Sequence, residues 1–321
     1  MAAGGPPVLV VTRVDDATAD GVITELNRRR VPVVRLDPGD FPTAVKMNAT
    51  FNGNGVAGTL STETRTIDLG DVRSVYWRRP TPYAVDLAMS EQTARWAVEE
   101  ARYGLGGVLA ALPGAHYLNH PWCNRDAEHK PAQLAMAARC GLNVPPTVIT
   151  NDPNQARACA HTHRPVLYKP LRETEYADTG GRALTVWIED VSPEQIDDRV
   201  RYTAHLFQQR VAKTADIRLT VVGENLFAVR IDGSPGVDWR RHYDRLSYTP
   251  IDVPAEIATG ARAYLDAFGL AFGAFDFGLD PDGSWHWYEC NPNGQWAWFP
   301  DDLTARITAA IADQLQYGGT A

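Results

Sequence analysis

The order of apolar and polar positions in residues 1–119 predicts a parallel β-α-β unit. An uninterrupted apolar run over 8–11 is typical of a buried strand. Residues 17–30 carry threonine and aspartate at their start and three arginines at their end, which suits the macrodipole of a helix. A second apolar run over 31–36 completes the strand-helix-strand sequence. Further strands are expected at 47–52, 56–60 and 72–77, and a long helix at 90–112.

After residues 119–121, where we place a domain boundary, helices between β-hairpins predict an α+β arrangement. A helix is expected over 124–141, in which Pro131 marks a start or a bend and Gly141 a cap. Asp280–Gly283 is a strong turn signal that predicts a hairpin. The other expected helices are 254–268 and 302–315, and the strands are 145–150, 165–170, 184–188, 204–211, 216–222, 225–232, 272–279 and 284–290.

Composition narrows the class of protein. The chain has 321 residues, enough for two domains of ~150 residues each and for a large core. Its 39 acidic and 31 basic side chains give a net charge of −8, which disfavours a general nucleic-acid-binding protein. The four cysteines lack C-x-x-C or zinc-ligand spacing, so we expect free thiols in a reducing compartment. Without a membrane-length apolar run or a signal peptide, the sequence predicts a cytoplasmic protein with no membrane partner.

The hairpin around 280–283 carries the most informative polar residues. Counting from the turn places residue 276 opposite 287, so Asp276, Trp287, Glu289 and Asn291 would share one face. Asp276 and Glu289 would then be diagonal neighbours. Two carboxylates and an amide oxygen are hard ligands that suit Mg²⁺ together with phosphate oxygens. The acids of the turn itself are explained by exposure to water. Two carboxylates on an otherwise apolar hairpin favour a metal site instead, because an unpaired buried carboxylate is costly.

A lysine and a polar loop form a second candidate. Lys169 ends an apolar strand, where its ammonium group could meet a phosphate or simply be exposed. The following segment 174–182 contains Gly180 and Gly181. Its backbone N–H groups could lie over phosphates, or it could be an ordinary hairpin. These alternatives stay open.

Arginines form a third candidate group. Asp216, Arg218 and Arg230 are expected at accessible positions of one hairpin, with Asp238 and Arg240 downstream. An arginine recognises phosphates and carboxylates through two parallel hydrogen bonds. Cross-strand salt bridges explain each arginine alone, but the group together with the nearby acid pair favours a site for a polyanion.

The segment Tyr76–Pro80 ends a predicted strand with Arg78 and Arg79 before a proline. Because proline cannot continue a β-ladder, these arginines are expected at an exposed strand end, where simple solvation is the alternative to binding. The chain contains no G-x-S-x-G elbow, P-loop or H-E-x-x-H motif. The first β-α-β unit also lacks the glycine pattern of nicotinamide-binding domains.

Taken together, these motifs resemble the ATP-grasp ligases, and more narrowly the ATP-grasp peptide maturases that make graspetides, the microviridin-type ribosomal peptides. The E-x-N ending is shared by ATP-grasp enzymes at large, whereas W-R-R-P with N-G-Q-W is more specific to the maturases. The resemblance spans the chain through residues 76–80, 118–121, Asn124, Lys130, 141–147, 168–170, 216–218, 275–277 and 289–296.

The resemblance implies a fold and a set of site residues. A Rossmann-like pre-ATP-grasp domain (1–119) would precede the central (120–211) and C-terminal (212–321) lobes of an ATP-grasp module. ATP would contact Lys130, Lys169, Gly180, Gly181, Gln208, Gln209 and Val211. Mg²⁺ would be bound by Asp276, Glu289 and Asn291. The catalytic residues would be Arg218, Asp238 and Arg240. The peptide would be bound by Arg78, Arg79 and Arg230. The family often has an acidic hinge residue where this chain has two glutamines, which leaves the ribose ligand open.

The implied activity is ATP-dependent cross-linking of a ribosomal precursor peptide with a leader and a core. Its Asp or Glu side chains would become acyl phosphates and then join Thr or Ser hydroxyls, or Lys amines. Segment 172–182 is a reasonable lid against water, and relatives suggest a homodimer. One alternative is a ligase that adds a free amino acid such as glutamate. A non-catalytic nucleotide-binding regulator is disfavoured, because every expected metal ligand and lysine is present.

Overall fold

The computed structural model describes residues 5–53, 55–85, 88–172, 176–177, 180–234, 236–241 and 243–318. The N-terminal part contains a four-stranded parallel sheet in the order β2-β1-β6-β7. Its strands are β1 (Val8–Val11), β2 (Val33–Leu36), β6 (Ser74–Trp77) and β7 (His116–Leu118). Helix α1 (Ala17–Arg28) connects β1 to β2, and Asp16 caps it by accepting the Ala19 N–H. The predicted β-α-β unit is confirmed.

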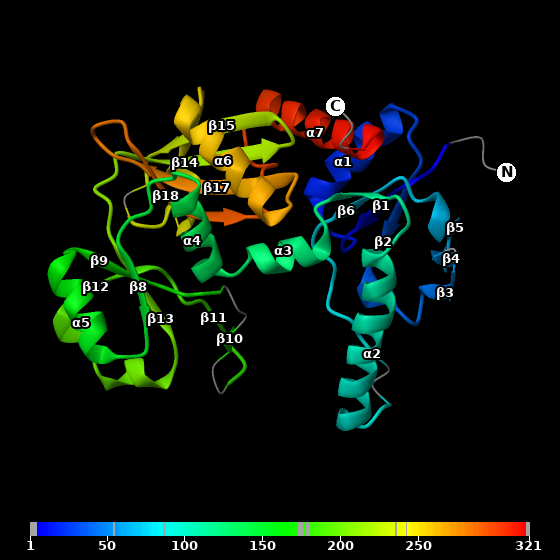
Figure 1. Ribbon diagram of the computed structural model, residues 1–321, viewed down its shortest axis with the longest axis horizontal. Helices are drawn as coiled ribbons and strands as arrows, with labels where there is room; N and C mark the ends of the chain where they lie inside the picture. Colours follow the sequence, from blue (N-terminus) through cyan, green and yellow to red (C-terminus); the bar gives the residue numbers. More distant parts are fainter. Residues whose placement is uncertain are drawn as a thin grey trace.

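A three-stranded antiparallel sheet and a long helix complete this part. The sheet contains β3 (Lys46–Asn52), β4 (Gly55–Ser61) and β5 (Thr66–Asp68). Helix α2 (Glu91–Ala110) confirms the predicted long helix, and Figure 1 shows it extending away from the rest of the chain. Short 3-10 helices within the described ranges are Pro38–Asp40, Leu69–Asp71, Pro193–Gln195, Asp198–Tyr202, Trp239–Arg241 and Tyr243–Arg245.

The middle of the chain forms a small lobe around a four-stranded sheet in the order β12-β9-β13-β8. Its strands are β8 (Thr147–Thr150), β9 (Val166–Lys169), β12 (Glu189–Val191) and β13 (His205–Gln209), and β10 (Tyr176–Ala177) pairs with β11 (Ala183–Leu184). The predicted strand over 184–188 is wrong, because most of that segment connects β11 to β12. Helix α5 (Pro153–Thr162) was not predicted, although Asp152 and Pro153 are a typical helix start.

The C-terminal lobe is a five-stranded antiparallel sheet with helices against both faces. The order is β16-β15-β14-β17-β18. The strands are β14 (Ala215–Val222), β15 (Asn225–Asp232), β16 (Ser247–Ile251), β17 (Phe272–Leu279) and β18 (Trp285–Asn291). Helix α6 (Ala255–Phe268) packs on one face and α7 (Asp301–Tyr317) on the other. These elements confirm the predicted hairpins and both helices.

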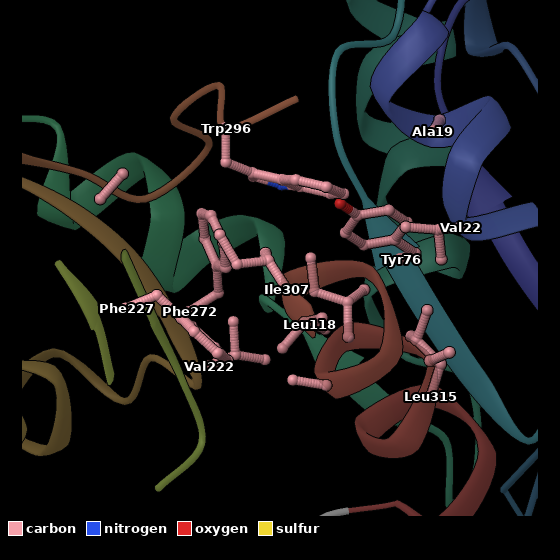
Figure 2. Close-up of a cluster of buried hydrophobic side chains, with 14 of the residues drawn as sticks. Ala19, Val22, Tyr76, Leu118, Val222, Phe227, Phe272, Trp296, Ile307 and Leu315 are labelled. Atoms are coloured by element: carbon pink, nitrogen blue, oxygen red, sulfur yellow. The ribbon is translucent and has the colours of Figure 1, made fainter. Parts of the chain in front are cut away.

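One hydrophobic core joins the N-terminal part to the C-terminal lobe. Figure 2 shows Val22 and Tyr76 from the N-terminal part in the same cluster as Phe272 and Ile307 from the C-terminal lobe. Helix α7 contacts α1 directly. Because these side chains are buried together, the two parts are held in a defined relation through which residues of one can position those of the other.

The predicted helix over 124–141 is two helices, α3 (Pro121–Ala127) and α4 (Lys130–Arg139). Pro131 lies in the first turn of α4, where its missing N–H costs no hydrogen bond. Gly141 follows with a φ of 79°, as expected for a helix cap. Both helices contact α6. All four cysteines are free thiols, and none of the helices in the described ranges has the length and apolarity needed to cross a membrane.

Helix α6 depends on Gly260 for its close contact with the end of α4. A Cβ atom there would lie 2.6 Å from Leu142 Cδ2 and 2.9 Å from the Cys140 carbonyl oxygen. We expect Gly260→Ala to lower the free energy of unfolding by about 1–3 kcal/mol in urea denaturation. Gly104 in α2 is the matched control, since a Cβ there meets nothing within 4 Å. Gly104→Ala should raise the stability by about 0.5–1 kcal/mol, and equal effects of both would contradict this packing.

Candidate functional site

A cavity of about 1290 Å³ lies between the small lobe and the C-terminal sheet. Strands β9 and β13 supply one wall, β14, β17 and β18 supply the other, and the segment 184–188 closes one side. Its lining includes eight residues that the sequence predicted: Lys130, Lys169, Gly181, Gln208, Val211, Asp238, Asp276 and Glu289. The tertiary structure therefore gathers residues as far apart in sequence as Lys130 and Glu289 around one cavity.

A β-bulge places the two predicted carboxylates directly opposite each other. Asp276 pairs with Glu289 and Phe277 pairs with Trp287, so Tyr288 is an extra residue in β18. The predicted pairing of residue 276 with 287, and the diagonal arrangement, are wrong for two reasons. The turn is one residue longer than counted, so that Leu279 pairs with Trp285, and the extra residue in β18 then shifts the register once more. Trp287 also leaves the predicted face and packs with Phe277 in the core beneath α6. Tyr288 and Glu289 both line the cavity.

Arg218 on β14 holds one oxygen of Asp276 and leaves the other available. Both residues are 6% exposed, and Arg218 Nη1 donates to Asp276 Oδ2 at 2.8 Å. Asp276 Oδ1 is buried and has no hydrogen-bond partner among the described residues. An unsatisfied buried acceptor is costly, so this oxygen is suited to a cation. Arg218 itself is outside the described lining, but it contacts the lining residue Asp276.

The other predicted metal ligands fit an oxygen-binding cation. The Glu289 carboxylate lies 3.4 Å from Lys130 Nζ, and Asn291 Oδ1 accepts the Asn293 N–H at 2.9 Å. The Asn291 oxygen keeps a second lone pair. The described residues contain no group of three or more His, Cys, Asp or Glu side chains suited to a metal. A cation here would complete its shell with ligand or water oxygens, as Mg²⁺ commonly does.

The two predicted lysines approach the cavity from different elements. Lys169 Nζ donates to Gln208 Oε1 at 2.5 Å and lies 4.5 Å from the centre of the Tyr288 ring. Lys130 Nζ donates to the Pro170 carbonyl oxygen at 2.9 Å. Lys169 is buried, whereas Lys130 is half-buried, and both are suited to neutralise phosphate charge. Gln209 and Gly180 are outside the described lining, unlike their neighbours Gln208 and Gly181.

The sequence analysis did not single out Lys213. Its ammonium group donates to both oxygens of Asp216, at 2.6 and 2.7 Å, and to the Val237 carbonyl oxygen at 3.0 Å. Burial raises the pKa of Asp216 to about 6, although Lys213 opposes this rise. The charges of Asp276 and Asp238 add to it. Three buried carboxylates thus lie close together along this wall, and only the fold of the connection after β13 brings Lys213 to them.

Some predicted residues lie elsewhere. Arg230 is opposite Ile217, on the α6 side of the sheet, and its salt bridge is with Asp232 at 2.9 Å. The predicted grouping of Arg230 with Arg218 is wrong, because Asp216 and Arg218 face the other side. The side chain of Arg240 and part of the predicted lid, residues 173–175 and 178–179, lie outside the described residues.

Arg78 is not at an exposed strand end. It is 3% exposed and makes a salt bridge with buried Asp16 at 3.2 Å. The prediction was wrong because a C-terminal segment containing Gln295 covers this end of β6, and Gln295 Oε1 accepts from Arg78 Nη2. Arg79 is half-buried, and its N–H donates to Thr12 Oγ1 at 3.4 Å. Both arginines are outside the described lining of the cavity.

Comparisons with known proteins concern the fold of the chain. The sequence profile of the MvdD pre-ATP grasp domain matches residues 7–125. No curated protein sequence matches the chain. Among solved structures, a RiPP-associated ATP-grasp ligase from Chryseobacterium gregarium, in complex with ADP and a leader and core peptide, has a TM-score of 0.89 and 26% identity. That match covers 97% of this chain and 96% of the other.

Two macrocyclases from Microcystis aeruginosa MRC are also similar. MdnC, bound with the precursor peptide MdnA, has a TM-score of 0.86 and 26% identity over 97% of this chain and 100% of its own. MdnB has a TM-score of 0.82 and 28% identity over 97% of this chain and 99% of its own. These findings confirm the predicted resemblance and fold: the chain has an MvdD-type pre-ATP-grasp domain and, over nearly its full length, the fold of the ATP-grasp ligases of ribosomal peptide maturation.

Proposed function

We propose that this chain is an ATP- and Mg²⁺-dependent ligase that cross-links a ribosomal precursor peptide. Asp or Glu side chains of the peptide would be activated as acyl phosphates, with release of ADP, and joined to Thr or Ser hydroxyls or to Lys amines. The observation that carries the proposal is the paired Asp276 and Glu289 with one buried oxygen unpartnered among the described residues, in a cavity that also contains Lys130 and Lys169. The peptide complexes of similar ligases support it.

The residues around the cavity divide into two functional groups. Lys130, Lys169, Gly180 and Gly181 are proposed to hold the phosphates of ATP. Gln208, Gln209 and Val211 are proposed to lie beside the adenine base. Mg²⁺ is proposed to bind Asp276, Glu289 and Asn291, where it would neutralise charge on the transferred phosphate. Structures similar to this chain include one with ADP.

The remaining polar groups suit the chemistry of an acyl phosphate. Arg218 lies beside Asp276, where its fixed charge can stabilise anionic oxygen atoms without reorganisation. Asp238 is buried in the cavity wall. We propose that Asp238 and Arg240 lie next to the attacking nucleophile. Segment 172–182 is proposed to exclude water, since water would hydrolyse the activated carboxyl group. A homodimer stays a prediction from the resemblance, and a cytoplasmic location stays a prediction from the sequence.

The test is a mass measurement on the peptide. The purified chain is mixed with any short acidic, Thr- and Ser-rich peptide that is encoded beside its gene, together with ATP and Mg²⁺. We expect the peptide to lose one water per bond and one ADP to form per bond. A gain of one amino-acid mass would instead identify the ligase that adds a free amino acid. An unchanged peptide without ADP formation would contradict both activities.

Lys169→Met is the variant that tests the nucleotide assignment. Because Lys169 is buried beside Gln208, we expect the KM for ATP to rise by about 10- to 100-fold, the scale of one lost charged hydrogen bond. Lys46→Met removes an exposed lysine from β3, remote from the cavity, and is the matched control. Equal KM values for the two variants would contradict the role of Lys169.

A further inference from the structure

The two motifs most specific to the maturases, Trp77–Pro80 and Asn293–Trp296, meet in space. Gln295 Oε1 accepts hydrogen bonds from Arg78 Nη2 at 3.0 Å and from Thr18 Oγ1 at 2.6 Å. Arg78 is fixed in turn by its salt bridge with Asp16. Asp16 also accepts a hydrogen bond from the Thr12 hydroxyl at 2.8 Å. The side chain of Gln295 is therefore held entirely by residues of the N-terminal part among those described.

The next residue is held by the same domain. Trp296 is 1% exposed, and Figure 2 shows its ring next to Tyr76 of β6. The shared core around it also includes Leu118 of β7 and, from the C-terminal lobe, Ile307. Two consecutive residues, one through hydrogen bonds and one through packing, thus fix the backbone of the segment after β18 against the N-terminal part.

The backbone of Gln295 leads from this contact to the candidate metal site. Its carbonyl oxygen accepts from Arg218 Nη2 at 3.3 Å, while Arg218 Nη1 donates to Asp276 Oδ2. Gly294 permits this approach: a Cβ there would lie 2.6 Å from Arg218 Nη2 and 2.3 Å from Ala274 Cβ. The segment is consequently in close contact with Arg218.

Arginine has a long flexible side chain, so a buried guanidinium keeps one orientation only while fixed acceptors hold it. Here one acceptor is Asp276 and the other is the Gln295 carbonyl oxygen. We propose that the N-terminal domain positions Arg218 through Gln295, and thereby directs the open oxygen of Asp276 toward the cation. Gln295, Arg78 and Thr18 are positioning residues in this arrangement. The inference rests on the proposed function and adds a role for the W-R-R-P motif within it.

The decisive variant is Gln295→Met, which keeps an unbranched side chain and removes the acceptor. We expect Mg²⁺ to bind the ADP complex about 10- to 100-fold more weakly in calorimetric titration, with a similar fall in kcat. The KM for ATP should stay unchanged, since Lys130 and Lys169 are untouched. Thr18→Val should act in the same direction, and Thr18→Ser, which keeps the hydroxyl donor, should restore both quantities.

Ser74→Ala is the matched control. Ser74 Oγ donates to the Leu315 carbonyl oxygen at 2.6 Å, so it also joins β6 to a C-terminal element, but it does not contact Gln295 or Arg218. We expect this variant to lose stability while keeping the Mg²⁺ affinity and kcat of the wild type.

The proposal would be overturned if the Gln295→Met variant had the same Mg²⁺ affinity and the same kcat as the Ser74→Ala variant. A wild-type protein that modifies no peptide would contradict the proposed function alone, because the Mg²⁺ titrations of the ADP complexes still decide the positioning role. A wild type that binds no Mg²⁺ in the presence of ADP would overturn both.

Discussion

Glu289→Gln is expected to abolish product formation while leaving the protein folded. The substitution removes a negative charge from the pair with Asp276 and keeps the size of the side chain. We expect kcat to fall by about 10²–10³-fold, the scale of losing one preorganised electrostatic contact in an active site. The Glu289 side chain is 23% exposed and its salt bridge with Lys130 is 3.4 Å long, so little stability should be lost. Peptide mass and ADP release measure the first effect, and thermal unfolding measures the second.

Glu224→Gln provides the comparison for that experiment. Glu224 is an exposed carboxylate in the same lobe, between β14 and β15, with a salt bridge to Arg262. Its replacement should change neither turnover nor unfolding. A folded Glu289→Gln protein with wild-type turnover would refute the metal assignment. An unfolded one would show a structural role instead, and Asp276→Glu, which keeps the charge but moves the oxygens, would then test the site.

Arg78→Met is expected to produce the largest loss of stability. Burial raises the pKa of Asp16, but Arg78 and the hydrogen bonds from Thr12 and the Ala19 N–H outweigh this and hold it below its ordinary value. Without Arg78, a buried carboxylate lacks its counter-charge, which typically costs about 3–5 kcal/mol. Urea denaturation above pH 6, where Asp16 is ionised, measures the loss.

Two further variants separate the charge from the packing. Asp16→Asn combined with Arg78→Met should be less destabilised than the sum of the single variants, because neither partner then leaves a buried charge. Arg95→Met breaks an exposed salt bridge of 3.2 Å with Glu91 in α2, and should change the stability by about 0.5 kcal/mol or less. A loss for Arg78→Met as small as that for Arg95→Met would contradict the importance of the buried pair.

Local patterns in the sequence determined much of the fold. The apolar run of β1, the polarity of α1 and the turn at 280–283 each depend on residues close together in the chain, and each predicted element is present. The types of candidate ligand were also predictable. Acids on an otherwise apolar hairpin indicated the carboxylates of the cavity wall, and a lysine at the end of an apolar strand indicated Lys169.

The tertiary structure decided how those residues are combined. A turn one residue longer than counted and the bulge at Tyr288 together changed which residue faces Asp276, because each added residue shifts the register by one position. Burial of Arg78 and the position of Lys213 depend on segments distant in sequence or on an irregular connection. Periodicity describes one element at a time, whereas exposure and charge pairing depend on which elements pack together. The sequence by itself therefore determined the elements and the chemistry available, and only the packing determined which groups face one another.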